Sequence, residues 1–157
     1  MSAITIINRQ MKAVPHTKGV DERNGLLWTV TIQADACPQK LRKALRCART
    51  MNMKLSIIFP DDFPMRPPFV YITEPCFRQG TGHVLAGGAV CAEIMSLTDS
   101  PGGWRPVICA FTFIETLLHV IDSGSPVVES HKKNTFADEA FAREGYKRAV
   151  ITHAWNV

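Results

Sequence analysis

The stretch "FPDDFPMRPPFVYI", residues 59–72, contains the end of one apolar segment, a proline-rich turn and the start of another apolar segment. Before it, "MKLSIIF" (53–59) alternates apolar and polar residues, as a half-buried strand does. After it, "PPFVYIT" (67–73) is rich in β-branched and aromatic residues, and its prolines suit a strand start or a sheet edge. The stretch therefore predicts two strands joined by a turn.

Upstream of this pair, two more elements are expected. The segment "LLWTVTIQ" (26–33) has the β-branched and aromatic composition of a strand. The segment "QKLRKALRCAR" (39–49) repeats apolar residues with helical spacing, so a helix is predicted between two strands. The repeated positions are Leu41, Ala44, Leu45 and Ala48.

Downstream, a long loop is followed by two helices. The segment "RPVICAFTFIETLLHVID" (105–122) is apolar on nearly every face, which predicts a largely buried helix from about Pro106. The segment "TFADEAFAREGYKRAVITHAW" (135–155) predicts a closing helix with Thr135 as its N-cap. Strands followed by helices predict an α+β fold with an antiparallel sheet, and a single domain over residues 1–157.

Composition narrows the class of protein. The chain has 157 residues, 46% of them hydrophobic, and its longest apolar run (107–114) is far too short to span a bilayer. The N-terminal residues lack the basic-then-apolar order of a signal peptide. We therefore expect a cytoplasmic or nuclear protein that does not bind membranes.

The net charge of +4 is concentrated in residues 39–49. This basic segment is either a nucleic-acid contact or the solvated face of a helix. No aromatic residues alternate with its basic residues, which favours the solvated helix and no nucleic-acid partner.

The five cysteines are odd in number and form no CxxC pair, which predicts free thiols. Cys76, His83 and Cys91 are separated by six and seven residues, a spacing that fits no common zinc site, so no metal is expected. Cys109 falls within the predicted buried helix and is expected in the core.

The long loop from 74 to 103 contains both His83 and Cys91. Loops of this length in compact domains are usually functional or disordered. Cys91 lies in "GGAVCAEIM" (87–95), where it is either a buried thiol or a nucleophile.

Three motifs, in this order, resemble those of the ubiquitin-conjugating enzyme family. They are "FPDDFPMRPPFVYI", the cysteine segment "GGAVCAEIM", and Gly103–Trp104 followed by Arg105–Pro106. The run "GHVLAGGAVC" (82–91) and the terminal "YKRAVITHAW" (146–155) are most similar to the family's Q-type branch. Before residue 50 the likeness is weaker, and only "IINRQMKAV" (6–14) is a candidate for the family's N-terminal helix.

The resemblance implies a four-stranded antiparallel sheet with a buried central helix and a C-terminal helix. It implies that Cys91 carries ubiquitin, or a ubiquitin-like protein, as a thioester received from an activating enzyme and passed to a substrate or ligase. No bound cofactor is expected, because only the upstream activating enzyme uses ATP. The alternative is a catalytically inactive variant that serves as a binding scaffold in the ubiquitin pathway.

One departure concerns the His-Pro-Asn motif that most of the family carries ten residues before the cysteine. Here His83 lies eight residues before Cys91 and no asparagine occupies the family's position. Backbone N–H groups around Gly87 and Gly88 are one possible support for the oxyanion. His83 is either a base or, as its loop position favours, a support for the loop.

The resemblance also suggests residues for acceptor activation and for docking. Asp122, Ser123 and Glu129 lie at or after the end of the buried helix, where the family lines the approach of the acceptor amine. Asp122 and Ser123 are alternatively plain stop signals of the helix. The residues carried over to partner binding are Met65 of the first turn and Trp104, Pro106 and Val107 of the second segment.

Overall fold

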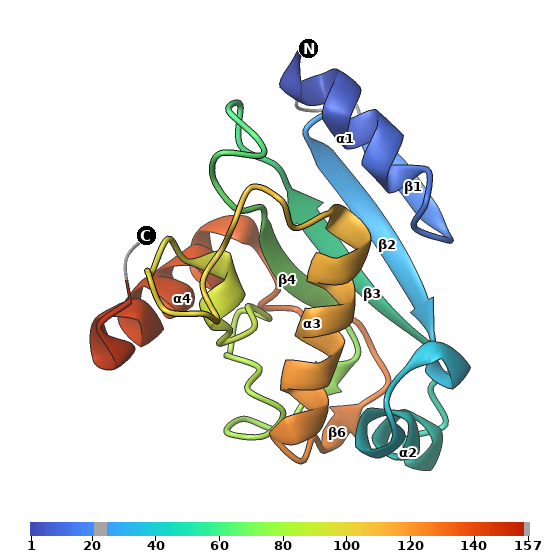
Figure 1. Ribbon diagram of the computed structural model, residues 1–157. Helices are drawn as coiled ribbons and strands as arrows, with labels where there is room; N and C mark the ends of the chain where they lie inside the picture. Colours follow the sequence, from blue (N-terminus) through green and yellow to red (C-terminus); the bar gives the residue numbers. More distant parts are fainter. Residues whose placement is uncertain (21–24, 156–157) are drawn as a thin grey trace.

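The structure is a computed structural model that describes residues 1–20 and 25–155 (Figure 1). Helices α1, α2, α3 and α4 and strands β1 to β6 follow one another along the chain, with two short 3₁₀ turns, η2 and η3. Their bounds are α1 Ala3–Met11, β1 Thr17–Val20, β2 Leu27–Gln33, η2 Ala34–Ala36, α2 Gln39–Cys47, β3 Asn52–Ile58, β4 Phe69–Glu74, β5 Cys76–Phe77, η3 Glu93–Met95, α3 Ala110–Ser123, β6 Val128–Ser130 and α4 Glu139–His153.

The main sheet has four antiparallel strands in the order β1-β2-β3-β4, as the resemblance implied. Strand β4 is an edge strand, and it begins at Phe69, directly after the two prolines. One face of the sheet is apolar because buried residues alternate along each strand and face each other across the register. These residues are Val30, Ile32, Met53, Leu55, Ile57, Val70 and Ile72.

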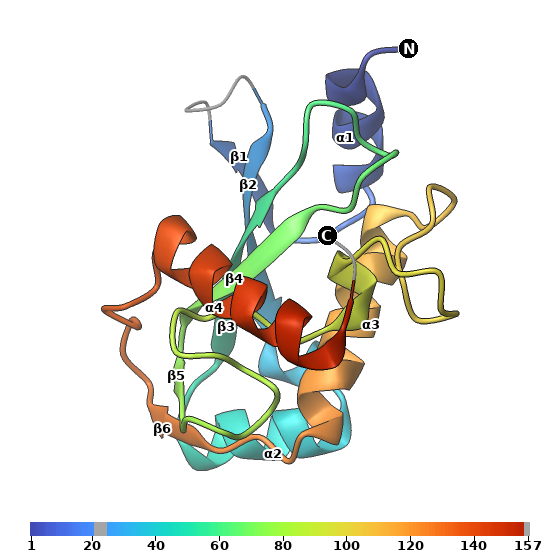
Figure 2. The same cartoon turned by 90° about the vertical axis from the view of Figure 1, so that its left-hand side faces the viewer.

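Helix α3 crosses the apolar face of the sheet (Figures 1 and 2). Six of its fourteen residues are buried, whereas Phe111, Thr112 and His119 are exposed, so the helix is buried on its sheet side only. The helix was predicted to begin near Pro106, but it begins at Ala110. The backbone N–H of Ala110 donates to Oε1 of Gln10 in α1 at 2.7 Å, so a residue from another helix helps fix where α3 starts.

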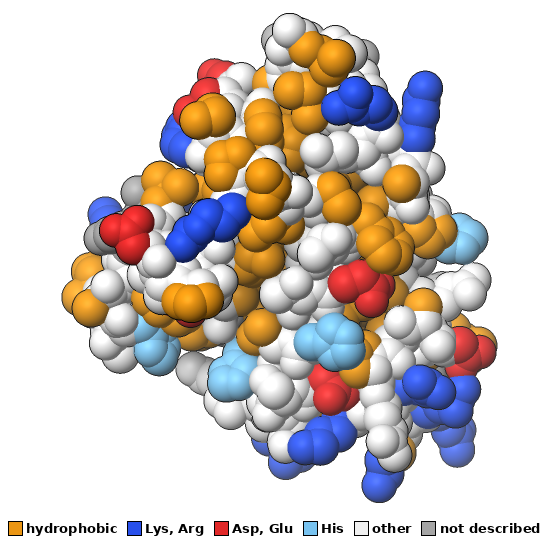
Figure 3. All heavy atoms as spheres, in the orientation of Figure 1, with side chains coloured by type: hydrophobic (Ala, Val, Ile, Leu, Met, Phe, Trp, Pro, Cys, Tyr) orange, Lys and Arg blue, Asp and Glu red, His pale blue; other side chains and the backbone are white. Residues whose placement is uncertain are grey.

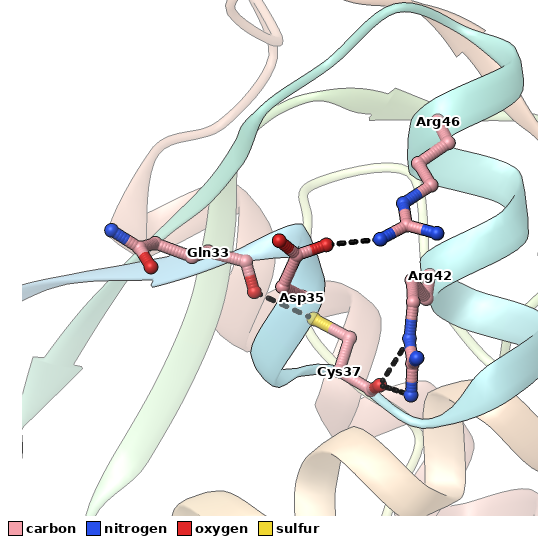
Figure 4. Close-up of polar contacts among 5 residues, drawn as sticks. All are labelled: Gln33, Asp35, Cys37, Arg42 and Arg46. Atoms are coloured by element: carbon pink, nitrogen blue, oxygen red, sulfur yellow. Dashed lines mark hydrogen bonds and ion pairs between the residues drawn. The ribbon is translucent and has the colours of Figure 1, made fainter.

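Helix α2 lies between β2 and β3, as its periodicity predicted, with Leu41 and Leu45 buried. Two of its basic residues, Arg42 and Arg46, contact the segment that precedes the helix (Figure 4). The Arg42 guanidinium donates to the Cys37 carbonyl through Nε and Nη2, at 3.2 and 3.1 Å, and Arg46 pairs with Asp35. These contacts favour a structural role for the helix over a nucleic-acid contact.

Helix α4 lies beside the β4 edge of the sheet (Figures 1 and 2). Its N-cap is Asp138, whose carboxylate accepts the Phe141 N–H at 2.9 Å, so the prediction of Thr135 as the cap was wrong. The Asx cap lies adjacent to the helical residues, whereas Thr135 precedes it in a turn. At the other end of the chain, α1 is a real helix of nine residues, with Ile7 and Met11 buried.

Candidate functional site

Cys91 is displayed at a tight turn. The N–H of Ala92 donates to the Val90 carbonyl at 2.9 Å, which closes a three-residue turn with Cys91 at its centre. The N–H of Cys91 donates to the His83 carbonyl at 2.7 Å. Cys91 is partly exposed and lies two residues before η3. The cysteine is therefore held by backbone hydrogen bonds without being buried.

The residues before Cys91 form a small hairpin that docks on β4. Val84 and Val90 pair, and the Ile72 N–H donates to the Gly88 carbonyl at 2.7 Å. A Cβ added to Gly88 would lie 2.2 Å from the Ile72 carbonyl oxygen, and the Gly88 φ is +91°. A Cβ on Gly87 would lie 2.7 Å from the backbone N of Ala142 in α4. Only glycine permits this close approach at both positions.

This packing changes the interpretation of the two glycines. The Gly88 N–H donates to the Leu85 carbonyl at 2.8 Å, so it is already engaged within the hairpin. The Gly88 N–H is therefore not free for the oxyanion role suggested for it, and both glycines have a packing role. The neighbouring N–H groups of Cys91 and Ala92 also donate to carbonyls.

His83 supports the cysteine loop mainly through its backbone. It has a φ of +55°, and its carbonyl accepts the Cys91 N–H. Its exposed ring lies against the end of α3: a Cβ added to Gly124 would be 2.7 Å from the ring carbon Cδ2. The adjacent Gly82 N–H donates to the Gly124 carbonyl at 2.9 Å. These contacts support a structural role for His83.

The thiols at Cys91 and Cys109 have opposite environments. Partial burial raises the pKa of Cys91. Cys109 is exposed at the N-cap of α3, where hydrogen bonds from Thr112 lower its pKa. The prediction that Cys109 lies in the core was therefore wrong, because α3 starts after this residue. Thiolate formation alone would favour Cys109, so any preference for Cys91 must come from its placement.

Tyr146 is a site residue that sequence reasoning missed. It lies in α4, is 4% exposed, and its hydroxyl donates to the carbonyl of Ala92 at 3.0 Å. Burial, followed by the nearby Cys91 and Glu93, raises the pKa of Tyr146. In the sequence, Tyr146 was visible only as the first residue of the terminal segment "YKRAVITHAW" (146–155), and no local pattern indicated its hydrogen-bond partner.

The residues suggested for acceptor activation have other partners. Oδ1 of Asp122 accepts the Leu41 N–H at 2.9 Å and so caps the start of α2. The Ser123 hydroxyl donates to the Val120 carbonyl at 2.7 Å and is exposed, and Glu129 is exposed on β6. Of these residues, Asp122 has a structural task that accounts for its position.

The two segments carried over to docking are joined by a hydrogen bond. The indole N–H of Trp104 donates to the Pro64 carbonyl at 2.9 Å and so ties the β3–β4 turn to the segment before α3. Met65 is 63% exposed and Val107 is 91% exposed, and Pro106 is also exposed. Trp104 itself is 2% exposed, so it holds this face together and is not a contact residue as predicted.

Within residues 1–20 and 25–155, no group of three or more His, Cys, Asp or Glu side chains is arranged to hold a metal ion. In the same residues, no helix has the length and apolar character needed to cross a membrane.

Comparisons with known proteins bear on this geometry. No protein-family model matches the chain. It is 30% identical over 100 residues to a Q-like E2 ubiquitin-conjugating enzyme of Drosophila melanogaster, covering 63% of this chain and 31% of that protein. It is 34% identical over 77 residues to a human Q-like E2 ubiquitin-conjugating enzyme, covering 49% of this chain and 44% of that protein. The chain thus spans less than half the length of these relatives.

Solved structures show the same fold. Human ubiquitin-conjugating enzyme E2 G1 is similar with a TM-score of 0.56 at 21% identity, over 76% of this chain and 93% of that chain. An E2 ubiquitin-conjugating enzyme from Plasmodium falciparum is similar with a TM-score of 0.51 at 18% identity, over 74% and 96% of the two chains. The chain therefore has the UBC fold of ubiquitin-conjugating enzymes and resembles their Q-type branch in sequence.

Proposed function

We propose that this protein is a ubiquitin-conjugating enzyme that carries ubiquitin, or a ubiquitin-like protein, as a thioester on Cys91. The observation that carries the proposal is the presentation of Cys91: a partly exposed thiol at the centre of a tight turn whose flanking backbone is hydrogen-bonded. This placement, within a UBC fold similar to Q-type enzymes, suits a nucleophile more than a packed thiol.

The proposed chemistry is two successive acyl transfers. The Cys91 thiolate attacks the carbonyl of a thioester on an activating enzyme; a new C–S bond forms and the activating enzyme's thiolate leaves. An acceptor amine then attacks the Cys91 thioester, loses a proton and forms an amide, and the Cys91 thiolate leaves. Transfer to a ligase cysteine is instead a thioester exchange. Because burial raises the pKa of Cys91, the thiol depends on a preactivated donor.

The partners follow from this chemistry and are part of the proposal. They are the modifier protein, its activating enzyme, and a ligase or substrate. In this proposal ATP is consumed by the activating enzyme, and the transfer needs no cofactor on this protein. Action in the cytoplasm or nucleus is supported by five free cysteines, which suit a reducing compartment.

A second candidate function is an inactive scaffold of the ubiquitin pathway. It is favoured by two observations: no asparagine stands at the family's position before Cys91, and Asp122 caps α2. The scaffold would bind the modifier or a ligase without forming a covalent adduct.

A charging assay separates the two functions. With an activating enzyme, ATP and labelled ubiquitin, the wild-type chain should form an adduct that a reducing agent removes. Cys91→Ala should abolish the adduct, and Cys91→Ser should give either no adduct or an ester that resists reduction.

The matched control is Cys109→Ala, because Cys109 is the more exposed thiol and has the lowered pKa. It should leave charging unchanged. An adduct that persists in Cys91→Ala, or is lost in Cys109→Ala, would assign the chemistry to another thiol. Folded wild-type protein that activating enzymes for several modifiers all fail to charge would favour the scaffold.

A further inference from the structure

Helix α4 contacts both the cysteine hairpin (residues 84–90) and Ala92, which follows Cys91. Its Ala142 backbone lies so close to Gly87 that a Cβ there would be 2.8 Å from the Ala142 Cα. One helical turn later, the Tyr146 hydroxyl donates to the Ala92 carbonyl. The helix therefore supports the chain both before and after Cys91.

The contact from Tyr146 differs from the other hydrogen bonds around Cys91. The bonds made by the Cys91 and Ala92 N–H groups, and the 3.2 Å bond from the Met95 N–H to the Ala92 carbonyl, all lie within one short segment. Tyr146 comes from 54 residues further along the chain. It ties the residue that follows Cys91 to helix α4.

We infer that Tyr146 is a positioning residue for Cys91, holding the Ala92 carbonyl toward the buried side of α4 so that the turn presents the thiol in one orientation. The inference rests on the proposed function, because the orientation matters for acyl transfer. Negative charge develops on the acyl oxygen during transfer. If the Ala92 carbonyl were free to turn toward that oxygen, its dipole would destabilise the developing charge. A small displacement of a reacting group also costs a large factor in rate.

The Tyr146 hydroxyl is suited to this task at neutral pH. Its burial and the neighbouring Cys91 and Glu93 raise its pKa, so the phenol keeps its proton and remains a donor. The bond is inside the molecule, where water does not compete for the carbonyl. The contact is therefore maintained while the thiol ionises.

A purely structural role for Tyr146 is the competing explanation, because its ring meets Phe69 edge-on at 5.8 Å between centroids. Tyr146→Phe separates the two roles, since it retains the ring and removes only the hydroxyl. The matched control is Tyr71→Phe, which removes the same group from a half-buried tyrosine on β4. Among the described residues, the Tyr71 hydroxyl has no hydrogen-bond partner.

The first measurement is amide hydrogen exchange on the full chain. Tyr146→Phe should speed exchange in the segment from Cys91 to Ser96 by about tenfold and leave the amides of α3 unchanged, while Tyr71→Phe should leave both unchanged. Unchanged exchange in this segment, or an equal increase across the sheet and α3, would overturn the inference.

The second measurement is single-turnover discharge of the Cys91–ubiquitin thioester to free lysine. Tyr146→Phe should lower the maximal rate about tenfold, without changing the lysine concentration that gives half of that rate. Tyr71→Phe should stay within about twofold of wild type. An unchanged maximal rate would overturn the inference. If the wild type is not charged at all, the proposed function fails. The positioning role is then decided by the hydrogen-exchange result, together with the alkylation rate of Cys91 in Tyr146→Phe compared with wild type.

Discussion

Cys37 illustrates how far a thiol's environment changes its chemistry. It is 2% exposed, its Sγ lies 3.5 Å from the Gln33 carbonyl (Figure 4), and burial raises its pKa from 9.0 to about 11. The folded state thus holds the Cys37 proton at a pH where the unfolded chain has released it. The stability that this proton contributes is complete below pH 9 and is lost as the pH rises toward 11.

We therefore expect the free energy of unfolding to fall by about 2 kcal/mol more in wild type than in Cys37→Ala between about pH 8.5 and 11. Urea unfolding across this range would measure the difference. If the free energy of unfolding had the same pH dependence in the two proteins, the Cys37 thiol would have the same pKa in the folded and unfolded states, which would contradict the prediction.

Gly88 is the position in the cysteine hairpin where a side chain is least tolerated. Gly88→Ala would place a methyl group 2.2 Å from the Ile72 carbonyl oxygen at a φ of +91°. Gly80 has a similar φ of +81°, but no atom within 4 Å would meet its Cβ. Gly80→Ala should cost about 1 kcal/mol from backbone strain alone. Gly88→Ala should cost at least about 2 kcal/mol more, as measured by denaturant unfolding; equal costs would contradict the close packing.

At the scale of elements, Asp122 connects the end of α3 to the start of α2. Its carboxylate accepts the Leu41 N–H, so Asp122→Ala should lower the free energy of unfolding by about 1 kcal/mol. Asp122→Asn keeps an acceptor oxygen and should retain most of that stability. Thermal unfolding of the two variants tests this difference.

Lysine discharge by the same two variants tests the acceptor role. If Asp122 acts only as a cap, Asp122→Asn should transfer ubiquitin at the wild-type rate. A large loss of rate with unchanged stability would restore the prediction that this carboxylate activates the acceptor. Ser123→Ala tests the neighbouring candidate in the same assay, because it removes an exposed hydroxyl at the next position.

The starts of the helices show where local patterns were insufficient. Periodicity predicted α2 and the existence of α3 and α4, because each buries an apolar stripe. It did not predict that α3 begins at Ala110, since the Gln10 side chain that accepts its N–H lies 100 residues away. A helix start depends on which group satisfies its free N–H groups, and that partner need not be local.

At the scale of the whole molecule, charge and apolar surface are distributed unevenly. Figure 3 shows Lys and Arg side chains gathered at the end of the molecule where α2 lies, and apolar side chains over α1 and α3. The exposed Met65 and Val107 belong to two segments that Trp104 ties together. The hydrogen bond from Trp104 and the exposure of Met65 and Val107 support the proposal that the β3–β4 turn and the segment before α3 form one docking face.

Met65→Asp and Val107→Asp should therefore weaken ligase-dependent discharge severalfold while shifting the free energy of unfolding by under about 0.5 kcal/mol. Met51→Asp is the matched control, because Met51 is 76% exposed but lies at the opposite end of β3 from Met65. Discharge assays with and without a ligase, together with thermal unfolding, measure both effects. Unfolding of Met65→Asp would show that Met65 is part of the core, and an equal loss in Met51→Asp would remove the case for a specific face.

The sequence by itself determined the strand pair β3–β4, the helix α2 and the existence of the buried helix. These follow from alternation and helical spacing, which are local properties of the chain. The role of Cys91 stays a prediction that rests on the order of the family's motifs. The prolines were predicted to mark a strand start or a sheet edge, and they lie directly before the first residue of β4, an edge strand of the main sheet.

Only the tertiary structure decided the roles of Tyr146, Asp122 and Trp104. In each case the side chain binds a backbone group at least 40 residues away: Ala92, Leu41 and Pro64 respectively. Sequence patterns report whether a residue is buried, but not which distant carbonyl or N–H lies beside it. That partner is set by how the strands and helices pack, because backbone groups removed from water must find a partner wherever the fold places one.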